Sequence, residues 1–176
     1  MPSESSLSWD NLPERKVWSD QLRASIAEFK TQLDQGDPEA FISGYAALTP
    51  ELQIKFWAEL IVAVAKFESN WKPHTIFHEP PPLGVDSVGL LQLSYEDQPN
   101  YHLEPLDRAA KTLEDPLVNL RCGMKIMAKL VSRDGIVASS AGSRHRGAAR
   151  YWSVLRAGHG HHLDEIKAMV KAQLGI

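Results

Sequence analysis

The sequence predicts an almost wholly helical protein, a bundle of helices arranged around a cleft. Apolar residues recur at helical spacing along most of the chain, whereas no segment shows the strict alternation of a strand. Thr or Asp followed by Pro marks several helix starts, a pattern typical of a capping residue and the first helical position. We therefore expect an all-α fold, with α+β character at most from a small β-hairpin in one long loop.

The first part of the chain predicts a polar arm and two helices. The arm runs to about Pro13. The helix after it has an apolar stripe, formed by Val17, Leu22, Ile26, Phe29 and Leu33. We expect this helix to end at Gly36 and a second one, bearing Phe41 and Tyr45, to begin at Asp37-Pro38.

The second half of the chain predicts further helices after a long loop. A polar stretch covers 95–113, and Asp115-Pro116 then caps a helix that carries Val118, Ile126, Met127 and Leu130. The last helices are expected over roughly 136–141, 148–155 and 163–174.

The third helix, which begins at Thr49-Pro50, places an acid among apolar residues. Glu68 follows Val64 by four positions and Ile61 by seven, so it shares their stripe. Burial disfavours the charged form of a carboxyl group and raises its pKa, so Glu68 could hold a proton near neutral pH and act as a general acid. Most acids near helix ends are solvated or paired, so position alone does not make Glu68 catalytic.

Four segments together resemble the soluble lytic transglycosylase and goose-type lysozyme family. They occur in the family's order between about Glu51 and Arg156, and they are Glu68-Ser69, Gly89-Leu90-Leu91-Gln92-Leu93, Asp115-Pro116-Leu117-Val118-Asn119 with Gly123, and Ala148-Ala149-Arg150-Tyr151-Trp152. In the second segment Leu91 stands where the family has Met. In the fourth, Trp152 replaces the family's usual Asn.

The resemblance implies a lysozyme-like helical fold and cleavage of the β-1,4 bond between MurNAc and GlcNAc in peptidoglycan, without a cofactor. It implies Glu68 as the catalytic acid, and its motifs contribute the expected substrate-binding residues Ser69, Gly89, Gln92, Asn119 and Tyr151. The match leaves the first two helices outside it. We expect residues 1–48 to form an arm and helical extension, packed as one globular unit on a lysozyme-like catalytic domain of residues 49–176.

Two of these residues also have ordinary structural interpretations. The amide of Gln92 can donate to and accept from sugar hydroxyl and acetamido groups, but it could equally bind backbone at the edge of the core. Tyr151 could be an aromatic core anchor, or its phenol could bond to Glu68 or to the sugar.

The Pro-rich interval 74–87 is longer than the family's usual connection and adds acids beside Glu68. Three consecutive prolines favour a stiff segment, which we expect to form a wall of the cleft. Glu79 and Asp86 in this interval are candidates for a second carboxylate. Inverting hydrolysis needs such a pair of carboxyl groups, roughly 6.5 to 9.5 Å apart, with water between one of them and the sugar.

These acids leave two mechanisms open. In the transglycosylase route Glu68 protonates the glycosidic oxygen and then accepts the proton of the muramic acid C6 hydroxyl, which closes a 1,6-anhydro ring. In the goose-type lysozyme route Asp86 or Glu79 activates water, and the substrate can be a modified glycan. The sequence favours the single-acid route. A non-catalytic wall-binding protein is a further alternative, although a binding module gains nothing from a desolvated acid.

Composition bounds the remaining possibilities. The chain has 176 residues with 43% hydrophobic content, which suits one globular unit, and it has no apolar run long enough to span a bilayer. Its net charge of −3 argues against general nucleic-acid binding. The expected partner is the peptidoglycan glycan strand, bound by a monomer. The beginning of the chain lacks the pattern of a signal peptide, so the expected periplasmic or extracellular location follows from the proposed substrate.

The remaining chemical groups have ordinary explanations. Cys122 has no disulfide partner and is expected to be a packing residue. The cluster Gly158-His159-Gly160-His161-His162 matches no recognised zinc motif, so we expect a polar helix entry and no metal. Arg144-His145-Arg146 is either a solvated loop or a site for carboxylates attached to the glycan.

Overall fold

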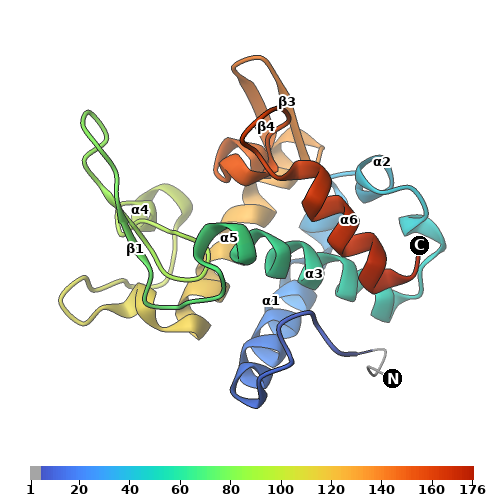
Figure 1. The fold of residues 1–176 in the computed structure, drawn as a ribbon, viewed down its shortest axis with the longest axis horizontal. Helices are drawn as coiled ribbons and strands as arrows, with labels where there is room; N and C mark the ends of the chain where they lie inside the picture. Colours follow the sequence, from blue (N-terminus) through green and yellow to red (C-terminus); the bar gives the residue numbers. More distant parts are fainter. Residues whose placement is uncertain (1–4) are drawn as a thin grey trace.

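The computed structural model describes residues 5–176 and is mostly helical, with two small antiparallel hairpins (Figure 1). The first four residues of the expected arm lie outside the described residues. The α-helices are α1 (Lys16–Asp34), α2 (Pro38–Phe41), α3 (Pro50–Ser69), α4 (Asp97–Tyr101), α5 (Pro116–Asp134) and α6 (Leu163–Leu174). The strands are β1 (Ile76–His78), β2 (Asp86–Val88), β3 (Ala138–Ala141) and β4 (Arg144–Gly147).

Helix α3 runs through the middle of the molecule, with α1, α5 and α6 around it (Figure 1). Its residues from Lys55 to Ala65 are all buried, so it is apolar nearly all round. The hydroxyl of Thr49 accepts the Leu52 N–H at 3.3 Å, which confirms the expected cap, and Asn70 in the left-handed conformation ends the helix. No helix in the part of the chain from residue 5 onward is long and apolar enough to cross a membrane.

Helix α1 packs against α5 and α3 and contributes to the same hydrophobic core. It ends at Asp34 with Gln35 as its C-cap, one residue before the expected Gly36, where a Cβ would fall 2.0 Å from Val131 Cγ1 of α5. The second helix is much shorter than the sequence predicts. It ends at Phe41, because Ile42 is extended and Gly44 has a φ of 102°, and Tyr45 begins a separate 3-10 turn.

The hairpin β1–β2 is the one that the sequence allowed for in the long loop. The second hairpin contradicts the sequence analysis, because 138–141 forms strand β3 and not part of a helix. Ala141 pairs with Arg144, which leaves Gly142-Ser143 as a two-residue turn, and Gly142 has the positive φ that such turns require. The turn signal of Gly142-Ser143 therefore outweighs the apolar content of the preceding segment.

The expected helix over 148–155 is also wrong. The chain forms two 3-10 turns, Ala148–Arg150 and Ser153–Leu155, separated by the extended backbone of Trp152. The Trp152 ring is buried, and its Nε1–H donates to the Leu91 carbonyl at 2.9 Å. This tertiary contact fixes the tryptophan between the two turns.

Asn119 on α5 is the clamp for the segment 89–93. Its Oδ1 accepts the Leu91 N–H, and its Nδ2 donates to the carbonyls of Val88 and Leu113, all at 2.9 Å. Close packing reinforces the clamp, because a Cβ on Gly89 would lie 2.3 Å from Asn119 Nδ2. On the same helix, a Cβ on Gly123 would lie 2.2 Å from Leu91 Cδ1. The segment is therefore held against α5 by both hydrogen bonds and shape.

Replacing Asn119 by Ala should lower the free energy of unfolding by about 2 to 4 kcal/mol, because three buried backbone groups lose their partners. Chemical denaturation of the purified protein measures this change. Asn100→Ala is the matched control, since the Asn100 side chain is exposed and makes one long bond of 3.4 Å. An equal loss in the two variants would contradict the clamp.

Candidate active site

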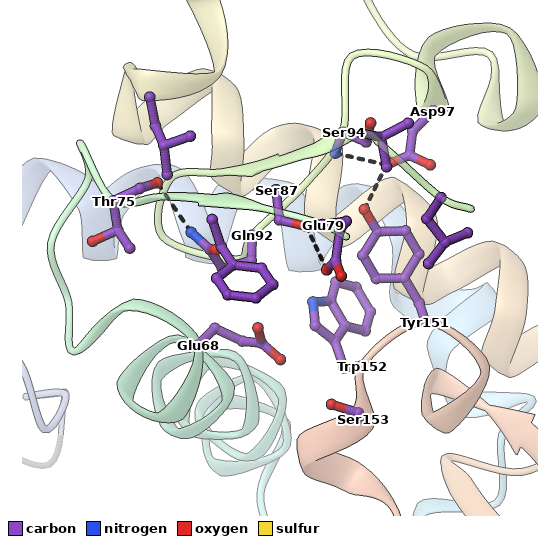
Figure 2. Close-up of a pocket in the computed structure, with 14 residues that line it drawn as sticks. Glu68, Thr75, Glu79, Ser87, Gln92, Ser94, Asp97, Tyr151, Trp152 and Ser153 are labelled. Atoms are coloured by element: carbon purple, nitrogen blue, oxygen red, sulfur yellow. Dashed lines mark hydrogen bonds between the residues drawn. The ribbon is translucent and has the colours of Figure 1, made fainter. Parts of the chain in front are cut away.

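A cleft of about 550 Å³ opens where the end of α3 meets the β1–β2 hairpin (Figure 2). The hairpin forms one wall, and the segments 92–97 and 151–153 form the others. Its lining consists of Glu68, Thr75, Ile76, Phe77, Glu79, Leu83, Val85, Ser87, Gln92, Ser94, Asp97, Tyr151, Trp152 and Ser153. The lining therefore holds three acids and no Lys or Arg.

Glu68 reaches into this cleft from the last turn of α3 (Figure 2). Desolvation by burial, and secondly the negative charge of Glu79, raise the pKa of Glu68 to about 7. No described residue forms a hydrogen bond or ion pair with its carboxyl that would hold it ionised. Glu68 therefore has a raised pKa that lets it carry a proton near neutral pH, as the helical stripe predicts.

Glu79 is the second carboxylate that the structure brings to the cleft. It follows β1, and the Ser87 hydroxyl donates to its Oε1 at 3.4 Å. Figure 2 shows its carboxyl facing the space above Glu68. Asp86 does not line the cleft, because its carboxylate is turned toward His78 and Arg108.

Asp86 instead belongs to a polar cluster outside the cleft. Its carboxylate is 2.6 Å from His78 Nδ1 across the hairpin and 3.4 Å from a guanidinium nitrogen of Arg108. Arg108 in turn pairs with Glu96 at 2.7 Å. Through Arg108, the cluster therefore ties the β1–β2 hairpin to Glu96 in the wall segment 92–97.

Gln92 lines the cleft with its amide nitrogen already bonded. The nitrogen donates to the carbonyls of Thr75 and Gly89, both at 3.0 Å, and the residue has a φ of 52°. The structural interpretation of Gln92 therefore holds for its donor side. Its carbonyl oxygen receives no hydrogen bond from the described residues, so that oxygen is the part of the amide with capacity for a ligand.

Tyr151 lies in the cleft but hydrogen-bonds to Asp97 and not to Glu68. Its hydroxyl donates to Asp97 Oδ2, and the Ser94 N–H donates to the same oxygen at 2.9 Å (Figure 2). Burial raises the pKa of Asp97, although the bond from Tyr151 acts in the opposite direction. Burial, together with the charge of Asp97, raises the pKa of Tyr151 well above its usual value, so the phenol keeps its proton.

Asp97 and Trp152 are cleft residues that the sequence analysis did not assign to the site. The signal for Asp97 is the spacing of Ser94 and Asp97, which resembles a capping box at the start of α4. Nothing in the sequence pairs Asp97 with Tyr151, because 54 positions separate them.

Three of the expected substrate-binding residues lie behind the cleft. Ser69, Gly89 and Asn119 are buried and do not line it. The Ser69 hydroxyl donates to the Leu90 carbonyl at 2.9 Å, as the Trp152 indole does to Leu91. In this structure these residues position the segment that carries Gln92.

The histidines near the C-terminus form a helix entry. His162 Nδ1 lies 2.8 Å from Glu165 Oε1, and the imidazole stacks on Phe67 with ring centroids 4.1 Å apart.

Cys122 is buried on α5, and burial raises the pKa of its thiol to about 12.

The comparisons with known proteins agree with this geometry. The family model described as "Transglycosylase SLT domain" matches residues 47–160, which is more than half of the chain. A comparison with curated protein sequences gives no match.

Among solved structures, the chain is similar to DslA (Bd0314) of Bdellovibrio. The wild-type DslA structure is 32% identical over 96% of each chain, with a TM-score of 0.83. Two variants of DslA, each with one Glu replaced by Gln, are also 32% identical, with TM-scores of 0.80 over 92% and 0.83 over 96% of each chain. The matched family model and the acid-bearing cleft lead to one conclusion: this chain belongs to the SLT transglycosylase domain family, with a lysozyme-like fold.

Proposed function

We propose that Glu68 is the acid that breaks a β-1,4 glycosidic bond between MurNAc and GlcNAc, and that Glu79 activates the water that completes the reaction. Membership of the SLT family makes peptidoglycan the substrate class and glycosidic-bond cleavage the reaction class. The roles of the two acids and the use of water are our proposal. The observation that carries it is the presence of both carboxyl groups in one cleft, with the charge of Glu79 raising the pKa of Glu68.

The chemistry follows from the different environments of the two acids. Glu68, with a pKa of about 7, gives its proton to the glycosidic oxygen as the bond to the sugar C1 breaks. Positive charge develops on the sugar ring in an oxocarbenium-like state. Glu79 takes a proton from a water molecule, whose oxygen bonds to C1 on the opposite face. The product is a new reducing end of inverted configuration.

The positions of the replaced glutamates in DslA support a pair of acids with the sequence spacing of Glu68 and Glu79. The two glutamates replaced in the DslA variants lie 11 residues apart in that protein. Glu68 and Glu79 are separated by the same number of positions in this chain. Because the two structures are so similar overall, this equal sequence spacing favours the interpretation that Glu68 and Glu79 correspond to the two replaced glutamates of DslA.

The transglycosylase route is the second candidate, and the name of the matched family favours it. In that route Glu68 alone acts, first as acid and then as base toward the C6 hydroxyl of the substrate. The sequence alone favours this route. Glu79 is the reason for preferring water here, because an anion facing the acid has no part in a single-acid mechanism.

The proposed substrate lies outside the cytoplasmic membrane of bacteria. We therefore propose that the protein acts in the periplasm or the extracellular space.

The products distinguish the two routes. Digestion of purified peptidoglycan in H₂¹⁸O should give fragments whose reducing ends carry one ¹⁸O, because the oxygen on C1 comes from water. Mass spectrometry of the unreduced fragments, analysed immediately, measures the label. Fragments that end in 1,6-anhydroMurNAc without label would establish the transglycosylase route instead.

Glu68→Gln should lower the rate of peptidoglycan cleavage by about a hundred-fold or more, because the amide cannot supply the proton. Glu51→Gln, an exposed change on the same helix, is the matched control and should retain activity. Clearing of a peptidoglycan gel by the Glu68→Gln variant would refute the role of Glu68. No clearing by the wild type on any peptidoglycan would favour a wall-binding protein.

Glu79→Gln should change both the rate and its pH dependence. The rate should fall by about ten- to a hundred-fold, because water loses its base. Glu68 must be protonated to act, so activity declines as pH rises through its pKa of about 7. Removing the charge of Glu79 lowers that pKa, so the alkaline decline should move to lower pH.

The control for this change is Asp86→Asn, which removes the other acid of the same hairpin. Its alkaline decline should stay at the wild-type pH, since Asp86 does not line the cleft. Rate measurements from pH 4 to pH 9, flanking the pKa of Glu68, compare the three proteins. The opposite result, a shifted profile for Asp86→Asn and an unchanged one for Glu79→Gln, would exchange the two assignments.

A further inference from the structure

A second pocket, of about 520 Å³, lies beside the β3–β4 hairpin and is strongly basic. Its lining residues are Ser143, Arg144, His145, Arg146 and Arg150. We call it the basic pocket. Its charge contrasts with the net charge of −3 of the whole chain and with the three acids of the cleft.

Only part of this positive charge is neutralised. Arg150 forms two bonds to the Asp134 carboxylate, at 2.5 and 3.1 Å, so these two charges balance. Arg146 donates to the backbone carbonyl of Asp134 at 2.7 Å, and this bond leaves its charge unpaired. The side chain of Arg144 is exposed and has neither a hydrogen bond nor an ion pair with any residue from 5 to 176, although its backbone pairs with Ala141 in the hairpin. Two guanidinium groups are therefore available to an anion.

His145 lies between Arg144 and Arg146 on β4, and the charged groups that act on its ring are Arg156 and His161. The Nδ1 of His145 is buried and has no hydrogen-bond partner among the described residues. Such an atom costs free energy in the folded protein unless a ligand or water pairs with it. Desolvation, followed by the positive charges of Arg156 and His161, lowers the pKa of His145, so its neighbourhood is itself electropositive.

The basic pocket and the cleft share a wall. Arg150 lines the basic pocket and the next residue, Tyr151, lines the cleft. The Cα atoms of adjacent residues are only about 3.8 Å apart. Figure 1 shows the β3–β4 and β1–β2 hairpins projecting toward the same side of the molecule. A glycan strand in the cleft would therefore carry its substituents past the basic pocket.

We propose that the basic pocket binds the carboxylates of the peptide stems of peptidoglycan while the glycan occupies the cleft. The inference rests on the proposed substrate. Each muramic acid carries a peptide through its lactyl group, and guanidinium groups bind carboxylates with paired hydrogen bonds. The cleft repels such anions, because its lining has three acids and no Lys or Arg. The basic pocket thus supplies the attraction that the cleft lacks, and it sets the preference for glycan with stems attached.

The first test measures binding without any cleavage. The isolated stem tetrapeptide, added to the whole ¹⁵N-labelled protein, should shift the NMR signals of the His145 ring and the Gly147 amide. The same peptide with all its carboxyl groups amidated should shift them little. Arg144→Gln should weaken the tetrapeptide affinity by about three- to ten-fold. Lys16→Gln, which removes one exposed charge outside the pocket, should leave the affinity unchanged.

Three outcomes of this titration would overturn the inference. They are no shift of the hairpin signals, equal shifts by the amidated peptide, and equal affinities in the Arg144→Gln and Lys16→Gln variants. Inorganic phosphate at the same concentration identifies the source of the anion. Shifts by phosphate as large as those by the tetrapeptide would assign the pocket to oxyanions in general and refute the stem as its ligand.

The second test uses cleavage. The ratio of kcat/KM on stem-bearing glycan to that on glycan stripped of its peptides should fall several-fold in Arg144→Gln and stay constant in Lys16→Gln. An unchanged ratio in Arg144→Gln would contradict the inference. Because the tetrapeptide contains no glycosidic bond, its binding is independent of the hydrolytic mechanism. Failure of the proposed reaction would therefore appear in the H₂¹⁸O experiment and leave the tetrapeptide titration unchanged.

Discussion

Burial of one carboxyl group organises the site. Glu68 sits in the last turn of α3, where the surrounding apolar side chains exclude water and Glu79 adds a negative neighbour. The carbonyl end of a helix carries partial negative charge, which also disfavours ionisation of an acid there. All three effects act in the same direction. The bundle supplies this environment, because α3 is buried along most of its length and only its end opens into the cleft.

Much of this arrangement could be predicted from local sequence, because helix periodicity and capping are local properties. The caps at Thr49 and Asp115 and the stripe that carries Glu68 all have sequence signals. The β3–β4 hairpin was missed because short apolar runs suit a helix and a strand equally, although Gly142 gave a turn signal. The choice between Glu79 and Asp86 depends on which face of a hairpin meets the cleft, and that is decided by tertiary packing.

Glu59 shows why burial alone could not identify the acid from the sequence. It is completely buried on the same helix, and burial raises its pKa too. However, it accepts hydrogen bonds from the N–H and hydroxyl of Ser8, at 2.9 and 2.7 Å. Glu59 therefore anchors the N-terminal arm to α3, while Glu68 has no such donor. The difference lies in a residue 51 positions away, which helical spacing cannot reveal.

The floor of the cleft is the segment 89–93, which carries Gln92 and is held rigidly, whereas the β1–β2 hairpin forms a wall with fewer contacts to the core. Asn119, Ser69 and Trp152 hold the floor segment 89–93 through buried bonds, so a substitution there disturbs folding as well as binding. The wall hairpin presents Phe77 and Leu83, which are 54% and 68% exposed and contribute little to the core. Substitutions at these two positions therefore change the free energy of unfolding little. During evolution, the β1–β2 hairpin can therefore change to suit different glycans, while Glu68 and the segment 89–93 are inherited unchanged.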